Sequence, residues 1–589
     1  MWRLFRHMRM YKPGYSVDTF MGECPSTDQL PLDPVECAGC VNVRSLETLA
    51  KKRQCSFAKN ACEMLIRSSP FFPVHSTPSE RRTAKKWTPH LHSLCQMKVV
   101  EKCDRNIIKH FGRYFATPKN ESMARCIFDG SSLDGAAGDP PTCNLAELTT
   151  LLRELSVCRK PKFIIGDLRH WFHQLPISED LRNHFGVSID GEYYRWCVLP
   201  MGWQYSPRLA QCISNFILLE ALSRAGVVVD FDSHHPPAIF KSSTVVACVW
   251  YDNFIIATTD GDLWDRVYFR LPQVCAEFNI VLKEWERYGN GMAVGSPLPK
   301  PCFLGLEFAL DHGQLIWRHI PKKLMKLASR IRNLGVNPTL RQVAEIIGFA
   351  IWDSTIALRP LLYLSSEIEI LRKVSICSQT MQWNGTVHLS DESSLILHSR
   401  CSEIARNVWI TIPPFHQTEV VYVATDSSDK AMGMIEFRDF QPYHVIRQLI
   451  PSDMVDCHIY IKELLAATIM IERTGSLHPG AKISIAIDNT AVVYAIRRMF
   501  TCNKVALELL RRIEKAVASH HLLLECIPIP GALNPADDPS RMRLTICPDR
   551  INAFRKVCMD HERRQGMAEQ TISGRRVQEF LDDEWMSIT

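Results

Sequence analysis

The chain of 589 residues lacks the apolar segments that a membrane or a secretory pathway requires. No stretch approaches the roughly 18 consecutive apolar residues of a membrane-spanning helix. The basic start, Met1–Arg6, is not followed by the apolar core of a signal peptide. The 22 cysteines follow no regular spacing, so no disulfide framework is indicated. These absences exclude an integral membrane protein and predict free thiols in an intracellular compartment, either the cytoplasm or the nucleus.

Internal repeats and low-complexity tracts are also absent. With 46% hydrophobic and 22% charged residues, the composition is that of an ordinary globular protein, so long disordered segments are not expected. At roughly 100–200 residues per domain, the length predicts three to five domains, each able to bury a core of its own.

The net charge of +6 is small but unevenly distributed. Residues 1–113 contain 19 Lys and Arg against 10 Asp and Glu, a net of +9, so the remaining residues sum to −3. A basic front on a near-neutral body suggests an anionic partner such as nucleic acid. A solvated basic extension without a partner explains the same charge equally well.

Apolar patterning divides the chain into regions of different secondary structure. Gly, Pro, Ser and Cys interrupt residues 1–95, where only Val43–Arg67 favours a helix. Short β-prone runs alternate with helical ones from about 96 to 310, and 320–375 is mostly helical. From 418 onward the expected elements are strands at Val420–Ala424, Ile483–Ile487 and Leu522–Ile529, and helices at Tyr460–Arg473 and Asn503–His520.

Two aspartates stand at the ends of apolar, β-prone runs. Asp167 ends the run Phe163–Gly166, and Asp252 follows Val245–Tyr251 and precedes a second apolar run. We expect the runs around Asp252 to form a β-hairpin with its turn at Asp252-Asn253. A helix cap at Asp167 and a simple turn at Asp252 are the alternatives. Brought together, the two carboxylates would bind a pair of Mg²⁺ ions.

The order of motifs around these aspartates resembles that of reverse transcriptases. Asp167-Leu-Arg-His-Trp-Phe172-His-Gln-Leu-Pro176 is similar to motif A, Leu199-Pro-Met-Gly202 with Ser206-Pro207 to motif B, and Trp250-Tyr251-Asp252-Asn253 to motif C. Four further segments match the family in the expected order: Ala124–Asp129 in the fingers, Asn279–Lys283 as motif D, Phe303–Glu307 as the motif E primer grip, and Gln342–Leu364 at the start of a thumb.

The resemblance implies a role for several side chains. Arg125 and Lys119 would bind the incoming triphosphate, Arg125 through a planar fork that suits phosphate oxygens. Phe172 would lie under the sugar, where it would clash with a ribose 2′-hydroxyl and so select deoxynucleotides. Gly202 would let the backbone approach the template and the nucleotide. Lys283 would protonate the departing pyrophosphate.

One position departs from the family pattern. The second acid of motif C is Asn253 here, which offers an oxygen but no negative charge. Asp167 and Asp252, at the positions that do most of the metal binding in the family, are both present. We therefore expect DNA synthesis at a reduced rate and with an altered preference between Mg²⁺ and Mn²⁺. A catalytically impaired remnant that still binds nucleic acid is the alternative.

Four further acids follow residue 418. Asp426 and Asp488 end strands, Glu463 lies on a helix, and Asp537 lies within Asn534–Arg541. Singly, each is also compatible with a cap, a solvated helix face or a turn. Together, their order over 418–545 resembles ribonuclease H, which binds two Mg²⁺ through four carboxylates and hydrolyses the RNA strand of a hybrid.

The last of these acids has two candidates. The run Asn534-Pro-Ala-Asp-Asp-Pro-Ser-Arg541 is particularly similar to the ribonuclease H of hepadnaviral polymerases, and it offers both Asp537 and Asp538. We prefer Asp537, because relatives share an Ala-Asp-x-x-Ser-Arg pattern. The catalytic-loop histidine of some members has no counterpart in Pro530–Leu533, which should affect product release more than metal binding.

The combined resemblance is to retroelement polymerases of the VIPER and DIRS type, and more distantly to hepadnaviral polymerase. It implies an α+β multidomain fold: a right-hand polymerase with fingers, palm and thumb, followed by an RNase H-like α/β domain. The expected parts are a basic N-terminal extension at 1–95, fingers and palm at 96–310, thumb and connection at 311–415, ribonuclease H at 416–545 and a C-terminal tail at 546–589.

Such an enzyme would copy retroelement RNA into DNA and degrade the RNA of the hybrid by two-metal catalysis, with two Mg²⁺ per active site. Its partners would be an RNA template, a DNA primer, the RNA–DNA hybrid, dNTPs and other retroelement proteins, without a membrane. Residues 1–95 would contribute to template binding. An RNA-dependent RNA polymerase is disfavoured by Phe172 and by the attached ribonuclease H pattern.

Overall fold

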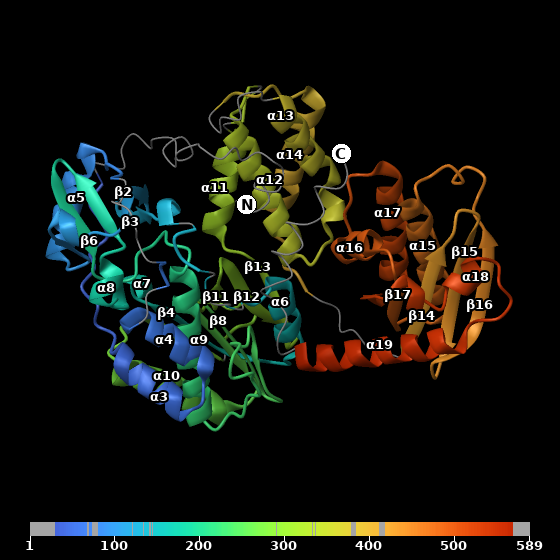
Figure 1. The fold of residues 1–589 in the computed structure, drawn as a ribbon, viewed down its shortest axis with the longest axis horizontal. Coiled ribbons are helices and arrows are strands. Elements are labelled where there is room, and N and C mark those ends of the chain that lie inside the picture. The colour runs from blue at the N-terminus through green and yellow to red at the C-terminus, as the bar shows by residue number, and fades with distance from the viewer. Residues whose placement is uncertain are drawn as a thin grey trace.

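The computed structural model describes residues 30–568 apart from short gaps. The gaps are residues 68–69, 73–79, 121, 134, 139, 141–142, 144, 290, 333, 336, 378–384 and 412–418. The fold is a mixed α/β arrangement of several units (Figure 1). In that view the N-terminal half lies on the left, a group of helices in the upper centre, and a separate sheet with its helices on the right. Within the described ranges, no helix combines the length and the apolar character needed to cross a bilayer.

The first sheet has five strands in the order β1–β6–β5–β2–β3. They are β1 (Val100–Lys102), β2 (Phe111–Pro118), β3 (Ala124–Asp129), β5 (Gly186–Ile189) and β6 (Glu192–Trp196), with the short helices η2 (Lys85–Trp87), η3 (Arg105–Ile107), η4 (Ser131–Leu133) and α8 (Glu179–Arg182) between them. The β5–β6 hairpin turns at Asp190 and Gly191, where φ is +51° and +81°. A type I′ turn needs two such left-handed residues, and the Asp-Gly pair adopts them readily.

The central sheet is entirely antiparallel, in the order β10–β4–β9–β8–β7. Its strands are β4 (Lys162–Leu168), β7 (Phe240–Lys241), β8 (Val245–Trp250), β9 (Asn253–Thr258) and β10 (Leu282–Tyr288). Alternate residues enter two different cores: Ile164 and Ile256 belong to one, and Phe163 and Ile255 to the other. Because both faces are buried, β4, β8 and β9 are continuous apolar runs, which is the pattern seen in the sequence.

Helices cover both faces of the central sheet. The first core receives α7 (Trp171–Gln174), α9 (Ser206–Arg224) and α10 (Gly261–Glu277), and the second receives α6 (Leu148–Val157). A small sheet, β11 (Cys302–Phe303), β12 (Leu306–Asp311) and β13 (Gln314–His319), contributes to the second core.

The N-terminal part of the described chain packs into the first of these cores. Its helices are α3 (Val43–Lys52), α4 (Ser56–Ile66) and α5 (Thr88–Gln96), which completely bury Leu46, Leu65 and Leu91. These helices are therefore an integral part of the unit, although residues 1–95 were expected to form a basic N-terminal extension. The sequence pattern is interrupted by Gly, Pro and Cys, whereas the helices are stabilised by tertiary contacts: α3 packs on α4, α4 on α9, and α5 on β1. Residues 1–29 and 73–79 of the expected extension lie outside the described residues.

A helical unit follows the small sheet. It contains α11 (Pro321–Arg332), α12 (Leu340–Ile356), η5 (Leu361–Leu364), α13 (Ser365–Cys377) and α14 (Asp391–Ala405). These helices enclose a core of their own. The start of α12 is fixed by a capping box in which Thr339 and Gln342 satisfy each other's backbone N–H groups. Pro360 separates α12 from α13, as a helix-breaking residue should.

The C-terminal sheet is mixed, in the order β16–β15–β14–β17–β18, with β14, β17 and β18 parallel. Its strands are β14 (Val420–Ser427), β15 (Ala431–Arg438), β16 (Gln441–Leu449), β17 (Lys482–Ile487) and β18 (Leu523–Pro528). One face is covered by α15 (Ile459–Leu477), α16 (Thr490–Arg498) and α17 (Lys504–Ser519). The short helices η6 (Gly531–Leu533) and α18 (Asp537–Ser540) follow β18.

The opposite face of this sheet is covered by α19 (Pro548–Ala568), which Figure 1 shows running beneath it. Phe554 and Cys558 of α19 are completely buried against Ala424 and Ala486. The segment expected to form a tail, 546–589, therefore begins with a helix that packs against this unit. Residues 569–589 lie outside the described residues.

Phe554→Ala should destabilise the C-terminal unit by about 3–5 kcal/mol, because it removes a buried ring that stacks on Phe437 with centroids 4.2 Å apart. Urea unfolding, followed by hydrogen exchange of the β14–β18 amides, measures the change. Lys556→Ala, on the exposed side of the same helix, should shift stability by less than about 0.5 kcal/mol. Equal stability of the two variants would contradict the assignment of α19 to this unit.

Candidate functional site

The structure brings Asp167 and Asp252 together at one edge of the central sheet. Asp167 lies in β4 directly opposite Asn253 of β9, and the Leu168 N–H donates to the Asp252 carbonyl at 2.9 Å. Burial, together with the negative charge of Asp167, raises the pKa of the Asp252 carboxyl to about 6. A buried carboxyl such as Asp252, whose ionisation is opposed by burial and by a neighbouring acid, is a group that a bound cation would stabilise in its charged form.

The hairpin that carries Asp252 turns one residue earlier than its sequence indicates. Trp250 pairs with Asn253, so Tyr251 and Asp252 form the turn and Asn253 begins β9. The expected turn at Asp252-Asn253 is thus corrected: Tyr251 adopts the left-handed conformation, with φ of +57°. This shift leaves the Asn253 Nδ2 free to donate to Asp252 Oδ1 at 2.8 Å.

Polar residues of α9 hold the tip of this hairpin. The Gln211 Oε1 accepts from the Tyr251 N–H at 2.7 Å, and its Nε2 donates to the Val249 carbonyl at 2.9 Å. The Ser214 hydroxyl donates to the Tyr251 carbonyl at 2.5 Å. Together these bonds fix the strained backbone from which Asp252 projects. Sequence reasoning missed Gln211 and Ser214, although two polar residues inside a long apolar helix are a usable signal of a buried polar contact.

Lys283 approaches the site through an irregularity in β10. The pairing with β4 slips between Leu282 and Glu284, which leaves Lys283 in a β-bulge. Its Nζ lies 2.7 Å from Asp167 Oδ2 and 2.8 Å from Glu284 Oε1. Partial burial lowers the pKa of Lys283, but the bonds to these acids outweigh it and raise the pKa to about 12. The ammonium is therefore fully charged at neutral pH.

Phe172, Arg125 and Lys119, which were also expected to bind a nucleotide, differ in their position relative to the two aspartates. Phe172 of α7 places its ring 6.4 Å from the Tyr251 ring. Arg125 is exposed on β3, and its charge lowers the pKa of Asp252 slightly against the effect of burial. Lys119 lies beyond β2, in an ion pair with Asp33 rather than with the site acids.

Gly202 lies where no other residue fits. Its φ is +112°, and an added Cβ would meet the Phe128 carbonyl oxygen at 2.0 Å. The neighbouring Met201 carbonyl accepts from the Phe128 N–H at 2.8 Å. The loop thus packs directly on the backbone of β3. This packing requires glycine at position 202, independently of the role expected from the resemblance.

A second group of acids gathers at one edge of the C-terminal sheet. Asp426 lies in β14, Asp488 follows β17, and Glu463 projects from α15. Because β14 and β17 are parallel and in register, both aspartates arrive at the same edge. One carboxylate oxygen of each of the three acids lies within 4.8 Å of the others.

The electrostatics of this triad fit a divalent cation. Burial, with the neighbouring charges, raises the pKa of Asp426 to about 6 and that of Glu463 to about 8, and it also raises the pKa of Asp488. The Glu463 Oε2 and the Asp488 Oδ1 are buried and accept no hydrogen bond. Buried carboxylate oxygens without partners are costly unless a cation binds them, and oxygen is the ligand that Mg²⁺ prefers.

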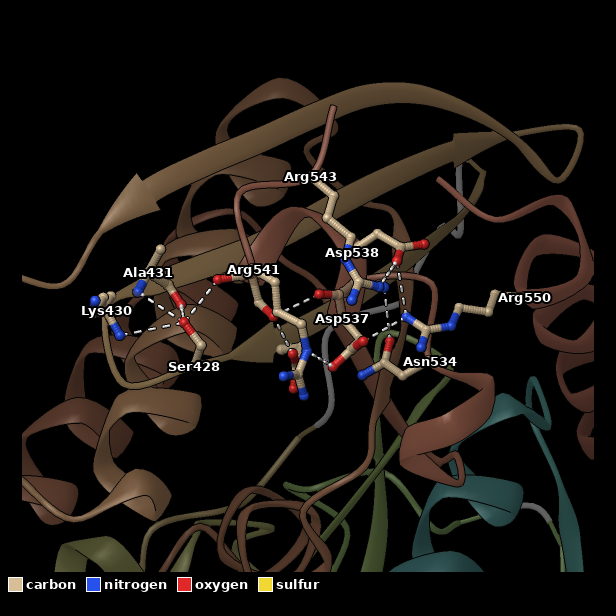
Figure 2. A network of polar contacts seen from close by, with 12 residues as sticks. Ser428, Lys430, Ala431, Asn534, Asp537, Asp538, Arg541, Arg543 and Arg550 are labelled. Carbon is tan, nitrogen blue, oxygen red and sulfur yellow. Dashed lines mark hydrogen bonds and ion pairs between the residues drawn. The ribbon is translucent and has the colours of Figure 1, made fainter. Parts of the chain in front are cut away.

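Asp537 and Asp538 lie beside the triad within an arginine cluster (Figure 2). Asp538 is buried, and its Oδ2 accepts from the Cys547 N–H at 2.8 Å while its Oδ1 pairs with Arg543 at 2.9 Å. Asp537 is slightly more exposed, at 14% of its side chain, and its charge contributes to the raised pKa of both Asp426 and Asp488. These contacts favour Asp537 over Asp538 as the fourth acid.

The segment that carries these two acids is fastened to β14 and β15. The Asn534 Nδ2 donates to the Thr425 carbonyl at 2.9 Å, and the Ser540 hydroxyl donates to Asp426 Oδ2. A Cβ on Gly433 would meet the Ala536 carbonyl oxygen at 2.3 Å, so only glycine allows this approach. Asn534 and Ser540 are positioning residues that sequence reasoning did not single out, although both belong to the same polar run as Asp537.

No protein-family model matches the chain. Over 123 residues it is 31% identical to the Gag-Pol polyprotein of walleye dermal sarcoma virus. That match covers 21% of the chain and only 6% of the viral polyprotein.

Three solved structures of a foamy viral protease-reverse transcriptase align with most of the chain at low similarity. A form labelled dRH, in complex with double-stranded DNA, gives a TM-score of 0.45 at 13% identity and covers 88% of this chain and 84% of its own. A complex with an RNA/DNA hybrid gives 0.44 at 14% identity, covering 82% and 62%. A second complex with double-stranded DNA gives 0.42 at 14% identity, covering 82% and 96%.

Gly202→Ala should destabilise the chain by at least about 2 kcal/mol, because the new methyl group combines a backbone clash with an unfavourable φ. Urea unfolding measures the loss. Gly295→Ala is the matched control, since nothing lies within 4 Å of its added Cβ, and it should change stability by less than about 0.5 kcal/mol. A Gly202→Ala chain of unchanged stability would show that the close packing on Phe128 is unimportant.

Without a divalent cation, the acidic triad should destabilise the fold as the pH rises. The pKa of Glu463 is raised from 4.5 to about 8 in the folded chain, so the folded state retains a proton that the unfolded state has lost. Its stabilising contribution is therefore present below about pH 4.5 and is lost as the pH rises toward 8. At pH 8, Mg²⁺ should raise the melting temperature of the wild-type chain.

Glu463→Gln should melt at a higher temperature than the wild type in EDTA at pH 8, and it should gain less from added Mg²⁺. Thermal melts with and without the metal measure both effects. Glu392→Gln, an exposed position on α14, should behave like the wild type. A full Mg²⁺ response in the Glu463→Gln chain would remove this residue from the metal site.

Proposed function

We propose that the chain is an RNA-directed DNA polymerase with ribonuclease H activity, which copies retroelement RNA into DNA and degrades the RNA strand of the hybrid. The observation that carries the proposal is the presence in one chain of two separate carboxylate sites at strand ends. Asp167 and Asp252 would form the polymerase site, and Asp426, Glu463 and Asp488 the ribonuclease H site. The motifs around both sites resemble those two families in the corresponding order.

The units of the fold take their roles accordingly. The first sheet with Lys119 and Arg125 would form the fingers, and the central sheet the palm. Helices α11–α14 would form the thumb and connection, and β14–β18 with α15–α19 the ribonuclease H domain. The element would be of the VIPER or DIRS type, with an RNA template, a DNA primer, the hybrid and dNTPs as partners.

At the polymerase site, Asp167 and Asp252 would bind Mg²⁺, which would supply the positive charge that lowers the pKa of the attacking 3′-hydroxyl and offsets the charge of the leaving pyrophosphate. Arg125 would bind the triphosphate oxygens through its guanidinium fork. Phe172, beside Tyr251, would support the sugar and exclude a 2′-hydroxyl. Lys283 would supply the proton for the pyrophosphate, since its ammonium is charged at neutral pH.

Asn253 determines how Asp252 is presented. Its Nδ2 donates to Asp252 Oδ1 at 2.8 Å, so it orients the carboxylate without adding a second negative charge. We infer that synthesis is retained but depends more strongly on the metal supplied than it would with an acid at this position. The same residue is the reason to keep an impaired, template-binding remnant as the alternative.

At the ribonuclease H site, Asp426, Glu463, Asp488 and Asp537 would hold divalent cations, which would activate water and stabilise the charge that develops on the scissile phosphate. Ser540 would keep Asp426 in place, and Asn534 would fasten the loop that carries Asp537. The two sites would thus act on the same nucleic acid through different residues, which makes them separable by mutation.

Asp167→Asn should reduce DNA synthesis by more than about 100-fold and spare hybrid cleavage, and Asp426→Asn should do the reverse. Loss of a metal ligand should exceed the 10–100-fold that loss of a supporting group costs. The assay is primer extension on an RNA template with dNTPs, and cleavage of labelled RNA in a hybrid, each with Mg²⁺ or Mn²⁺. Each variant is the control for the other's activity.

Three outcomes would contradict the proposed function or its site assignments. Loss of both activities in either variant would show misfolding or wrong site assignments. Absence of extension by the wild-type chain with both metals, while it still binds the template, would favour the impaired remnant. Absence of both binding and extension would reject the proposal altogether.

A further inference from the structure

A helix outside the ribonuclease H resemblance reaches the fourth candidate acid. The resemblance covers 418–545, whereas α19 begins at Pro548. In its first turn, the Arg550 Nη1 donates to Asp537 Oδ2 at 2.7 Å and to Asp538 Oδ1 at 3.3 Å. Figure 2 shows the Arg550 guanidinium reaching both carboxylates. One side chain thus joins two consecutive acids to a helix that sequence comparison alone assigns to a tail.

The helix that carries Arg550 is firmly anchored. Phe554 and Cys558 are buried in the core beneath the sheet, and the His561 Nε2 lies 2.8 Å from Glu525 Oε1 on β18. The Arg550 side chain is only 19% exposed. An ordered guanidinium on a packed helix loses little further entropy when it forms an ion pair.

The other arginines of the cluster are placed differently. Arg541 pairs with Asp537 Oδ1 at 2.7 Å but is 58% exposed, and Arg543 pairs with Asp538 and is 57% exposed. Ion pairs of such exposed side chains are weak, because solvent screens them. Arg550 is therefore the contact best able to hold Asp537 in one orientation.

Asp537 needs such a support because of its neighbours. The Ser540 hydroxyl donates to the carboxylate of Asp426 and lies 2.9 Å from the Asp537 carbonyl oxygen, which places the backbone of α18 beside the triad. The Asp537 carboxylate itself is repelled by Asp426 and Asp488. Without an opposing cation, that repulsion would turn the side chain toward solvent.

We propose that Arg550 is a positioning residue that holds Asp537 beside Asp426 and Asp488, so that the four carboxylates can bind divalent cations together. This inference rests on the ribonuclease H function proposed above. An arginine suits the task because its planar guanidinium donates to two carboxylates at once and keeps its charge. A lysine in its place would retain the charge but would reach one carboxylate at a time.

The test measures metal binding as well as activity. Mn²⁺ binding is followed by electron paramagnetic resonance in full-length chains that also carry Asp167→Asn, so that the signal comes mainly from the second site. Hybrid cleavage is measured against Mn²⁺ concentration in the same chains. Arg550→Gln should raise the half-saturating Mn²⁺ concentration about 10–100-fold in both measurements. Arg550→Lys should give a smaller rise.

Arg543→Gln is the matched control, because Arg543 belongs to the same cluster but pairs only with Asp538 among the two acids. It should shift the Mn²⁺ midpoint less than about threefold, since it leaves Asp537 in place. A shift as large as that of Arg550→Gln would overturn the proposal, because any loss of charge from the cluster would then have the same effect.

Further outcomes separate positioning from folding. A folded Arg550→Gln chain with a lower melting temperature but an unchanged Mn²⁺ midpoint would overturn the proposal, since Arg550 would then be merely structural. If Arg550→Gln fails to fold, Arg550→Lys decides: an unchanged midpoint overturns the proposal and a raised midpoint supports it. Arg550-dependent Mn²⁺ binding in a chain that never cleaves hybrid would support the role of Arg550 and reject the ribonuclease H function.

Discussion

Carboxylates held close together in partly dry surroundings repel one another, and the fold has to keep them from moving apart. Burial, together with this repulsion, raises the pKa of Asp426 to about 6 and that of Glu463 to about 8. Both acids project from elements that are held firmly in place. Asp426 lies on a strand within a hydrogen-bonded sheet, and Glu463 lies on a buried helix. Asp252 is held in a similar way, because the Leu168 N–H and the polar residues of α9 fix the backbone around it. The free energy that opposes the repulsion thus comes from the cores beneath the acids.

The two sites oppose this repulsion with different chemistry. Around Asp252, neutral groups act on the backbone: Gln211 and Ser214 hold the hairpin tip, and the carboxylate itself is oriented by Asn253. Around Asp537, charged groups act on the carboxylate, with Arg550 on one oxygen and Arg541 on the other. Neutral contacts fix position without changing the local charge, whereas ion pairs also reduce the charge available to a cation. A carboxylate with arginines on both oxygens has to release one of them to bind a metal, and the exposed Arg541 is better able to leave than Arg550, which can keep holding the carboxylate in place.

The strands that carry the acids could be predicted from the sequence, because a continuous apolar run has a single structural explanation there. The strands β4, β8 and β9 are apolar throughout because both faces are buried, and an acid after such a run marks a strand end. The turn at Tyr251-Asp252 was missed by one residue, because Asp and Asn both favour turns and only the contacts with α9 decide between the registers. Helix α19 was not predicted because its apolar face is narrow and is flanked by charged residues. Helices α3 and α4 lie within the segment Val43–Arg67 that was expected to be helical, whereas α5 was missed because tertiary packing, which no local pattern records, stabilises it.

The charge balance differs between the two sites, and it indicates a different order in which a cation and a further ligand bind at each. At the first, the ammonium of Lys283 lies against Asp167 and partly offsets its charge before any cation arrives, while the neutral Asn253 beside Asp252 adds no further negative charge. A cation there needs further anionic oxygens, and a nucleotide triphosphate is the kind of ligand that provides them. At the second, three carboxylates converge and two of their buried oxygens lack hydrogen-bond partners. Such a triad gains from binding a cation before any substrate is present. Under the proposed function, metal and nucleotide would therefore bind together at the first site, and metal would precede the hybrid at the second.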